Sequence, residues 1–173
     1  EVREALEKSD YGERVHLCLQ AFHDDVAGLP GPFPEPLHAG NRDAAIAMLE
    51  EIARAVFAKD LEDNFMHRGW LHRWLQIIPA YADWQIQRAG QWTVQEVERN
   101  AEVALGQGWW LRGRLDRIDR DNEGSLCIID YKTGAVPKKE EVLQGEAVQL
   151  PSYSLLSGAA SHVEYLQLDG GQV

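Results

Sequence analysis

Cysteine is scarce in this sequence of 173 residues, which contains only Cys18 and Cys127. Two cysteines are too few for a disulfide framework, and they exclude a four-cysteine zinc or iron–sulfur site within the chain. Both lie in apolar sequence context. We therefore predict that they are buried thiols of a cytosolic protein.

Long apolar runs are also lacking, and none approaches the roughly 20 residues that a membrane-spanning helix requires. The first residues, Glu-Val-Arg-Glu, are charged and unlike a signal peptide. The chain begins without Met and already in helical register. We expect no membrane partner and predict that the chain is a piece of a longer polypeptide.

Positive charge is in short supply, with 17 Lys and Arg against 28 Asp and Glu and a net charge of −11. This balance argues against a general nucleic-acid binder. Residues 109–139 are an exception, because they carry 7 basic and 5 acidic side chains. Any DNA binding would therefore depend on this stretch, on metal ions or on a partner region.

Hydrophobic periodicity predicts a helical first half and a sheet in the second half. Helices are expected over residues 11–27, 42–59 and 66–89, with Ser9 and Asp10 as caps of the first and a Pro-rich loop at 28–36. Strands are expected over 93–105, 109–119, 125–132 and 162–168, with a helix over 146–156 before the last strand. The expected fold class is α/β of the α+β kind, in a single domain over residues 1–173.

The candidate chemistry lies between Gly113 and Gly134, where charged residues end two apolar runs. Strand alternation puts Asp130 and Lys132 on one face, about 7 Å apart. A turn at residues 121–124 would pair the two strands and bring Asp116 near Asp130. Carboxylates that close repel each other unless a proton or a cation lies between them, and oxygen ligands favour Mg²⁺ or Mn²⁺.

Four motifs in order carry a family resemblance: Gly-Glu-Arg-Val-His at 12–16, Gly-Arg-Leu-Asp at 113–116, Asp-Tyr-Lys at 130–132 and Gln-Leu-Pro-Ser-Tyr at 149–153. This set resembles the PD-(D/E)XK nuclease superfamily, and within it the RecB-like and AddB-like C-terminal nuclease domains of bacterial helicase–nucleases. The resemblance implies a restriction-endonuclease-like core of helix, three antiparallel strands, helix and strand in a mixed sheet. Residues 28–90 would be a helical insert after the first helix, and 91–168 the catalytic sheet and helix.

The resemblance also implies a metal site. Asp116 and Asp130 would bind Mg²⁺ or Mn²⁺, together with the backbone carbonyl of Tyr131. His16, from the first helix, would complete the ligands that the protein supplies. An iron–sulfur cluster, which AddB-like relatives often carry, is not expected because its cysteines are lacking.

The remaining catalytic roles follow from the same resemblance. Lys132 would orient or deprotonate the attacking water. Gln149 and Tyr153, one helical turn apart, would position the water, the lysine or a DNA phosphate. Glu98 matches an acidic position of some relatives, and Glu96 and Glu102 compete with it.

Basic residues near the site are candidates for DNA contacts. We favour Lys138 and Lys139 in the loop after the site and include Arg114. Arg117 is also a candidate, although it shares a strand face with Asp119 and could simply pair with it.

The function implied is a metal-dependent DNA nuclease, an exonuclease acting on single-stranded or duplex ends in recombination and double-strand-break repair. It would be attached to or associated with helicase-type regions in a bacterial cytoplasm. The alternative is a catalytically silent module with the same fold that binds DNA ends or a partner.

Overall fold

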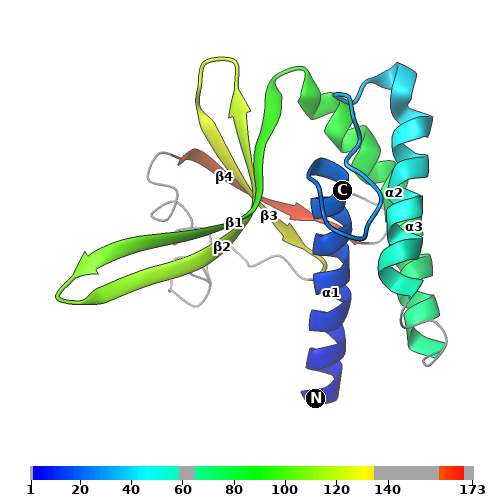
Figure 1. Ribbon diagram of the computed structural model, residues 1–173, viewed down its shortest axis with the longest axis horizontal. Helices are drawn as coiled ribbons and strands as arrows, with labels where there is room; N and C mark the ends of the chain where they lie inside the picture. The colour runs from blue at the N-terminus through cyan, green and yellow to red at the C-terminus, as the bar shows by residue number, and fades with distance from the viewer. Residues whose placement is uncertain (1, 59–64, 135–159, 170–173) are drawn as a thin grey trace. The chain divides into compact units, whose positions relative to one another are not determined.

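In the computed structural model, residues 2–58, 65–134 and 160–169 are described. Within these ranges three α-helices precede a four-stranded sheet (Figure 1). The helices are α1 Val2–His23, α2 Arg42–Phe57 and α3 Phe65–Ala89, with a short 3₁₀ helix, η1, at Ala39–Asn41. The strands are β1 Trp92–Gly106, β2 Trp109–Asp121, β3 Leu126–Lys132 and β4 Ala160–Gln167. The predicted α+β, restriction-endonuclease-like arrangement is confirmed.

The chain forms two compact units. The helical unit comprises Glu1–Gly90 and Gln167–Val173, and the sheet unit comprises the residues between them. The change from helix to strand falls between Ala89 and Trp92, where the sequence pattern predicted it. The helix predicted at 146–156 lies outside the described residues, and the single domain over 1–173 stays a prediction.

Helix α1 begins nine residues earlier than expected, so the prediction that Ser9 and Asp10 cap it was wrong. The preceding stretch, Arg-Glu-Ala-Leu-Glu-Lys, consists of strong helix formers and continues the helix upstream. Asp10 is exposed, and its carbonyl accepts a hydrogen bond from Arg14 at 3.0 Å.

The helices of this unit pack through the apolar stripes that the periodicity predicted. Helix α2 contacts both α1 and α3. The largest buried side chains are Tyr11, Leu19, Phe22, Leu49, Ile52, Phe57, Trp74, Ile77, Ile78 and Tyr81. Cys18 is fully buried among them, as predicted. A bidentate ion pair from Arg42 to Asp83, at 2.6 and 3.1 Å, joins the start of α2 to α3.

The Pro-rich loop after α1 lies close against that helix. Phe33 donates a backbone hydrogen bond to the carbonyl of Phe22 at 3.0 Å, and the two rings stack 5.6 Å apart. A Cβ at Gly31 would overlap the carbonyl oxygen of Ala21, and the φ of Gly31 is +101°. Only glycine meets both conditions at low cost.

The sheet has the strand order β1-β2-β3-β4, and its first three strands are antiparallel neighbours. The turn between β2 and β3 is built on Asp121, whose Oδ1 accepts hydrogen bonds from the amides of Glu123 and Ser125 at 2.9 and 2.8 Å. Gly124 occupies the left-handed region at φ +89°. This turn is the one that the sequence predicted, and it sets the register of the two strands.

The register divides the residues of β2 and β3 between two faces. Arg117 pairs with Ile129, Ile118 with Ile128, and Asp119 with Cys127. Residues opposite each other in an antiparallel pair point to the same side. One side, which we name the cysteine face, therefore carries Arg117, Asp119, Cys127 and Ile129. The other, the aspartate face, carries Asp116, Ile118, Ile128, Asp130 and Lys132.

The β1–β2 hairpin is longer than the rest of the sheet. The pairing of β1 with β2 extends from Trp92 opposite Asp121 to Gly106 opposite Trp109. In contrast, β3 pairs with residues 117–120 of β2. In Figure 1 the tip of the hairpin extends away from β3 and β4.

No helix among the described residues has the length and apolar character of a membrane span.

An ion pair is buried on the cysteine face. The guanidinium of Arg117 donates to both carboxylate oxygens of Asp119, at 2.7 and 2.9 Å, and both side chains are fully buried. This confirms the pairing that the sequence offered as the alternative to a phosphate contact. Removing one partner of a buried ion pair leaves the other charge in a poorly solvating environment.

We predict that Arg117→Ala lowers the free energy of unfolding by about 3–5 kcal/mol. Arg120→Ala is the matched control on the same strand, because Arg120 is exposed, and it should cost less than about 1 kcal/mol. Urea denaturation monitored by circular dichroism measures both. In the double variant Arg117→Met with Asp119→Leu, much of the stability should return. Equal losses in the two single variants would contradict the prediction.

Candidate active site

Two buried carboxylates meet on the aspartate face. Asp116 on β2 and Asp130 on β3 are 6% and 1% exposed, and the β2–β3 pairing places them on the same face of the sheet. The backbone amide of Tyr131 donates to Asp116 Oδ2, at 2.8 Å. The β2–β3 register brings these carboxylates together, as the strand alternation and the turn predicted.

The closeness of the carboxylates disfavours ionisation. Burial, together with the hydrogen bond and the negative charge of Asp116, raises the pKa of Asp130 from its ordinary 3.8 to about 7, and Lys132 opposes this shift. A hydrogen bond between two carboxyl groups requires a proton on one of them. With its pKa raised in this way, Asp130 takes up a proton more readily than an isolated carboxyl group does, and a bound cation could take the place of that proton.

Lys132 lies beside this pair. Its Nζ is 3.0 Å from Asp130 Oδ2, and its side chain is 22% exposed. The same Nζ lies 5.3 Å from the ring centre of Tyr165 on β4. A carboxylate and an aromatic face thus hold one amine whose tip can still reach solvent.

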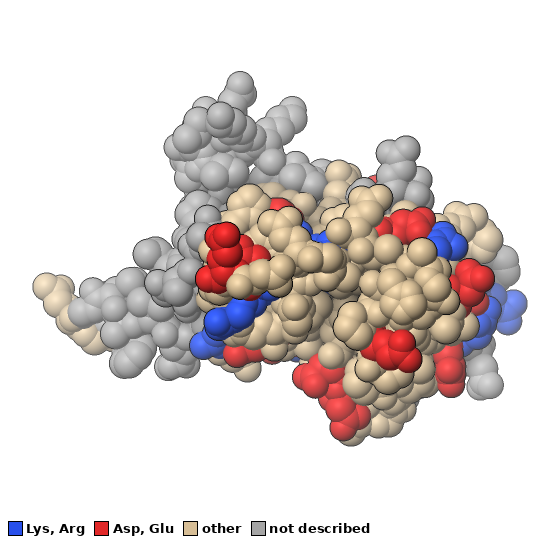
Figure 2. Space-filling view, turned by 90° about the horizontal axis from the view of Figure 1, so that it is seen from above, with Lys and Arg blue, Asp and Glu red and all other residues tan. Residues whose placement is uncertain are grey.

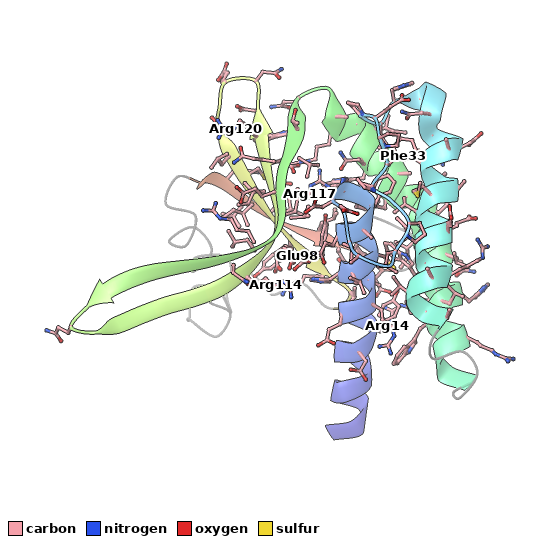
Figure 3. The ribbon with its side chains drawn as sticks, viewed as in Figure 1. Arg14, Phe33, Glu98, Arg114, Arg117 and Arg120 are labelled. Carbon is pink, nitrogen blue, oxygen red and sulfur yellow. The ribbon has the colours of Figure 1, made fainter. Side chains whose placement is uncertain are left out.

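Glu98 on β1 belongs to the same cluster. A carboxylate oxygen of Glu98 lies within 4.8 Å of one of Asp116. Figure 3 labels Glu98 and Arg114, and Arg114 Nε lies 2.6 Å from Glu98 Oε2. The φ of Glu98 is +50°, a positive value that is unusual for a residue other than glycine. Residues with such uncommon backbone conformations cluster at functional sites.

Sequence reasoning left Glu98 in competition with Glu96 and Glu102. Glu96 is opposite Ile118 and pairs with Arg99 at 3.2 Å. The side chain of Glu102 lies outside the described residues. Of the three, Glu98 is therefore the one that the structure places beside Asp116. Its signal in the sequence was the match to an acidic position of relatives.

The other predicted site residues are distributed as follows. His16 is half-buried on α1 in the helical unit. Tyr131 is buried on β3, and its carbonyl remains a proposed ligand. Gln149, Tyr153, Lys138 and Lys139 lie outside the described residues. Arg114 is exposed and paired with Glu98, so a DNA contact by Arg114 would compete with that ion pair.

Figure 2 shows charged side chains of both signs on the face of the described residues that it presents. In Figure 2 the acidic side chains of the described residues form separate red groups, with small blue groups between them. An interspersed surface of this kind gives little long-range attraction for DNA.

The residues of the cluster suit a hard divalent cation. Glu98, Asp116 and Asp130 supply carboxylate oxygens, which Mg²⁺ and Mn²⁺ prefer. Two buried carboxyl groups on one face of neighbouring strands fit such an ion, because a cation relieves the burial and mutual repulsion that raise the pKa of Asp130. Asp116 and Asp130 would hold the ion, with Glu98 within reach of the same position.

Paired acidic residues and a lysine on two neighbouring antiparallel strands of an α+β fold are the arrangement of nucleases with a D-x-K motif. A family model of the PD-(D/E)XK nuclease superfamily matches residues 1–172. The chain belongs to this superfamily.

The individual relatives share only low sequence identity with this chain. An uncharacterized protein of Rickettsia conorii is 23% identical over 151 residues, which is 86% of this chain and 17% of that protein. One subunit of the ATP-dependent helicase/deoxyribonuclease of Streptococcus agalactiae is 27% identical over 86 residues, which is 50% of this chain and 8% of that protein. The chain therefore spans less than a fifth of the length of these relatives.

The raised pKa of Asp130 predicts how stability depends on pH in metal-free protein. The folded-state pKa of Asp130, about 7, exceeds the ordinary 3.8. The folded state therefore binds more protons than the unfolded state between these values, and the contribution of Asp130 to stability is lost as pH rises through this window. We expect Asp130→Asn, which stays neutral, to be more stable than wild type by about 2 kcal/mol at pH 8. At pH 4 this gain should largely vanish.

Urea unfolding in the presence of EDTA, at several pH values, measures this difference. Asp25→Asn is the control, since Asp25 is exposed in the loop after α1, and its stability should follow wild type throughout. A constant offset between Asp130→Asn and wild type from pH 4 to 8 would show that Asp130 does not titrate in this window.

Proposed function

We propose that this chain is a divalent-metal-dependent deoxyribonuclease that hydrolyses phosphodiester bonds. The observation that carries the proposal is the pair of buried carboxyl groups, Asp116 and Asp130, on one face of neighbouring strands, with Lys132 Nζ 3.0 Å from Asp130 Oδ2. Membership of the PD-(D/E)XK nuclease superfamily supports it.

The residues of the chain have distinct roles in the proposed reaction. A Mg²⁺ or Mn²⁺ ion, when bound, would acidify a water molecule and stabilise negative charge on the phosphate. Asp116 and Asp130 would hold the ion, and Asp130 would bind it in the ionised form. Lys132 orients the attacking water or stabilises charge as it develops on the transferred phosphoryl group.

Three further assignments rest on the sequence motifs. His16 and the Tyr131 carbonyl would complete the metal ligands, and Gln149 with Tyr153 would position the water, Lys132 or a phosphate. Lys138, Lys139 and Arg114 are the proposed DNA contacts. Each assignment can be tested by single substitution in the assays below.

The proposed setting is DNA end processing. The name of the Streptococcus agalactiae relative joins a helicase to a deoxyribonuclease. By analogy, we propose that this chain is an exonuclease acting on single-stranded or duplex ends in recombination and double-strand-break repair. It would work with helicase-type regions or partner proteins in a bacterial cytoplasm.

Lys132→Ala should lower the rate of Mn²⁺-dependent DNA cleavage by about 100-fold or more, because the group that acts on the water or phosphate is lost. Asp116→Asn should abolish both cleavage and Mn²⁺ binding. End-labelled single-stranded and duplex DNA report cleavage, and calorimetry reports Mn²⁺ binding. Arg54→Ala and Asp25→Asn, both at exposed positions of the helical unit, are controls that should behave as wild type.

These measurements also separate the enzyme from a silent binding module. Undiminished cleavage by Lys132→Ala would overturn the role given to this residue. Wild-type protein that neither binds Mn²⁺ nor cleaves DNA, yet retains DNA ends in a gel-shift assay, would favour the silent module.

A second substitution pair tests the place of Glu98. Glu98→Gln should weaken Mn²⁺ binding about tenfold, because it removes one negative charge next to Asp116. Glu96→Gln, two residues away on the same strand, is the matched control and should bind Mn²⁺ as wild type does. Calorimetric titration at pH 8 compares the two, and equal affinities would remove Glu98 from the site.

A further inference from the structure

A second group of metal-ligating side chains lies within the sheet unit. Cys127 Sγ, a ring nitrogen of His162 and a carboxylate oxygen of Glu164 all lie within 4.8 Å of one another. Cys127 is on β3, and the other two residues are on β4, its neighbour in the sheet.

This group lies on the side of the sheet opposite the aspartate pair. Cys127 is directly opposite Asp119 and so belongs to the cysteine face. His162 and Glu164 alternate with Tyr165, which contacts Lys132 on the aspartate face. The two clusters are therefore separate sites that lie on opposite faces of the sheet and share strand β3.

The three side chains differ in character from the oxygen ligands of the aspartate face. A thiolate, an imidazole and a carboxylate are each common ligands of Zn²⁺, and a thiol is a poor ligand for Mg²⁺. In a tetrahedral zinc site, bonds of about 2.0–2.3 Å place neighbouring ligand atoms roughly 3.5 Å apart. The observed separations allow this geometry after small side-chain movements.

The burial of the three side chains suits an ion held at the edge of the protein. Cys127 is fully buried, Glu164 is half-buried, and the His162 side chain is 53% exposed. A zinc site with three protein ligands keeps one position for water, and the exposed side at His162 could provide it.

Hydrogen bonding alone accounts for the closeness of His162 and Glu164. His162 Nε2 lies 2.7 Å from Glu164 Oε1, which is an ordinary pair of residues two apart on one strand. Cys127 Sγ donates to the Ile128 carbonyl at 3.8 Å, a long bond from a weak donor. That pair does not require a thiol beside it, whereas a thiolate is a favourable third ligand for Zn²⁺.

We propose that Cys127, His162 and Glu164 bind Zn²⁺ and thereby tie β4 to β3. Binding would release the thiol proton, so that a thiolate meets the ion. The ion would link two neighbouring strands, with water in its fourth position. The site is independent of the proposed nuclease activity, because its ligands lie on the other face of the sheet.

Cobalt titration of chelator-treated protein tests the proposal. Co²⁺ replaces Zn²⁺ at such sites, and a thiolate ligand produces a charge-transfer band in the near ultraviolet. We expect this band in wild type and in Asp116→Asn, loss of the band in Cys127→Ser, and Co²⁺ binding weaker by about tenfold or more in His162→Ala. Zn²⁺ should displace Co²⁺ at stoichiometric amounts, whereas millimolar Mg²⁺ should not.

Two matched controls identify the ligands. Cys18→Ala removes the other cysteine, which is buried in α1, and should keep the band. His72→Ala removes an exposed histidine on α3 and should bind Co²⁺ as wild type does. His162→Ala changes a largely exposed side chain, so it remains informative if Cys127→Ser does not fold.

Thermal unfolding provides a second readout. Zn²⁺ should raise the melting temperature of wild type and Cys18→Ala, but not that of His162→Ala. Absence of the band in wild type, or its survival in Cys127→Ser, would overturn the proposal. Because Asp116→Asn should keep the band while losing Mn²⁺ binding, failure of the zinc site is distinguishable from failure of the nuclease assignment.

Discussion

The contact between Asp116 and Asp130 is the constraint on which the rest of the sheet unit depends. Two buried carboxyl groups in such proximity are stable only with a proton or a cation between them. The β2–β3 turn imposes the contact, because Asp121 and Gly124 determine how the strands align. A slip of one residue would move Asp116 to the cysteine face and separate the pair.

Charge is treated differently on the two faces of the sheet. On the cysteine face, Arg117 and Asp119 neutralise each other in a closed, fully buried pair. On the aspartate face, three carboxyl groups, of Glu98, Asp116 and Asp130, face two cations, Arg114 and Lys132. The charges of Arg117 and Asp119 balance each other, so this pair needs no further counter-ion. The second cluster needs one more positive charge, and either a proton on Asp130 or a bound cation can provide it.

Sequence alone predicted the parts of this arrangement that follow from strand periodicity. The alternation of side chains and the Asp-Asn-Glu-Gly turn placed Asp116, Asp130 and Lys132 together, because both depend only on neighbours along the chain. The start of α1 was mispredicted, since Ser9 and Asp10 are good caps but also tolerable at helical positions whose neighbours favour helix.

The position of Glu98 shows why the remaining details resist prediction. The register of β1 against β2 shifts between Val94 and Glu96, and Glu98 itself has a positive φ. Neither irregularity follows from periodicity, and each changes which glutamate faces Asp116. The grouping of Cys127 with His162 and Glu164 was equally hidden, because it depends on β4 lying beside β3.

The two ligand sets also bear on metal selectivity. Zn²⁺ generally binds nitrogen and oxygen sites more tightly than Mn²⁺ does, so an oxygen cluster alone does not exclude it. A thiolate and an imidazole on the other face would hold Zn²⁺ more tightly than the three carboxylates. At limiting Zn²⁺, the cysteine site would therefore fill first and leave the aspartate pair to the more abundant hard cation. Alternate side chains of a strand point to opposite faces, which separates the soft ligands from the hard ones, and under both proposals this separation would direct the two metals to different faces.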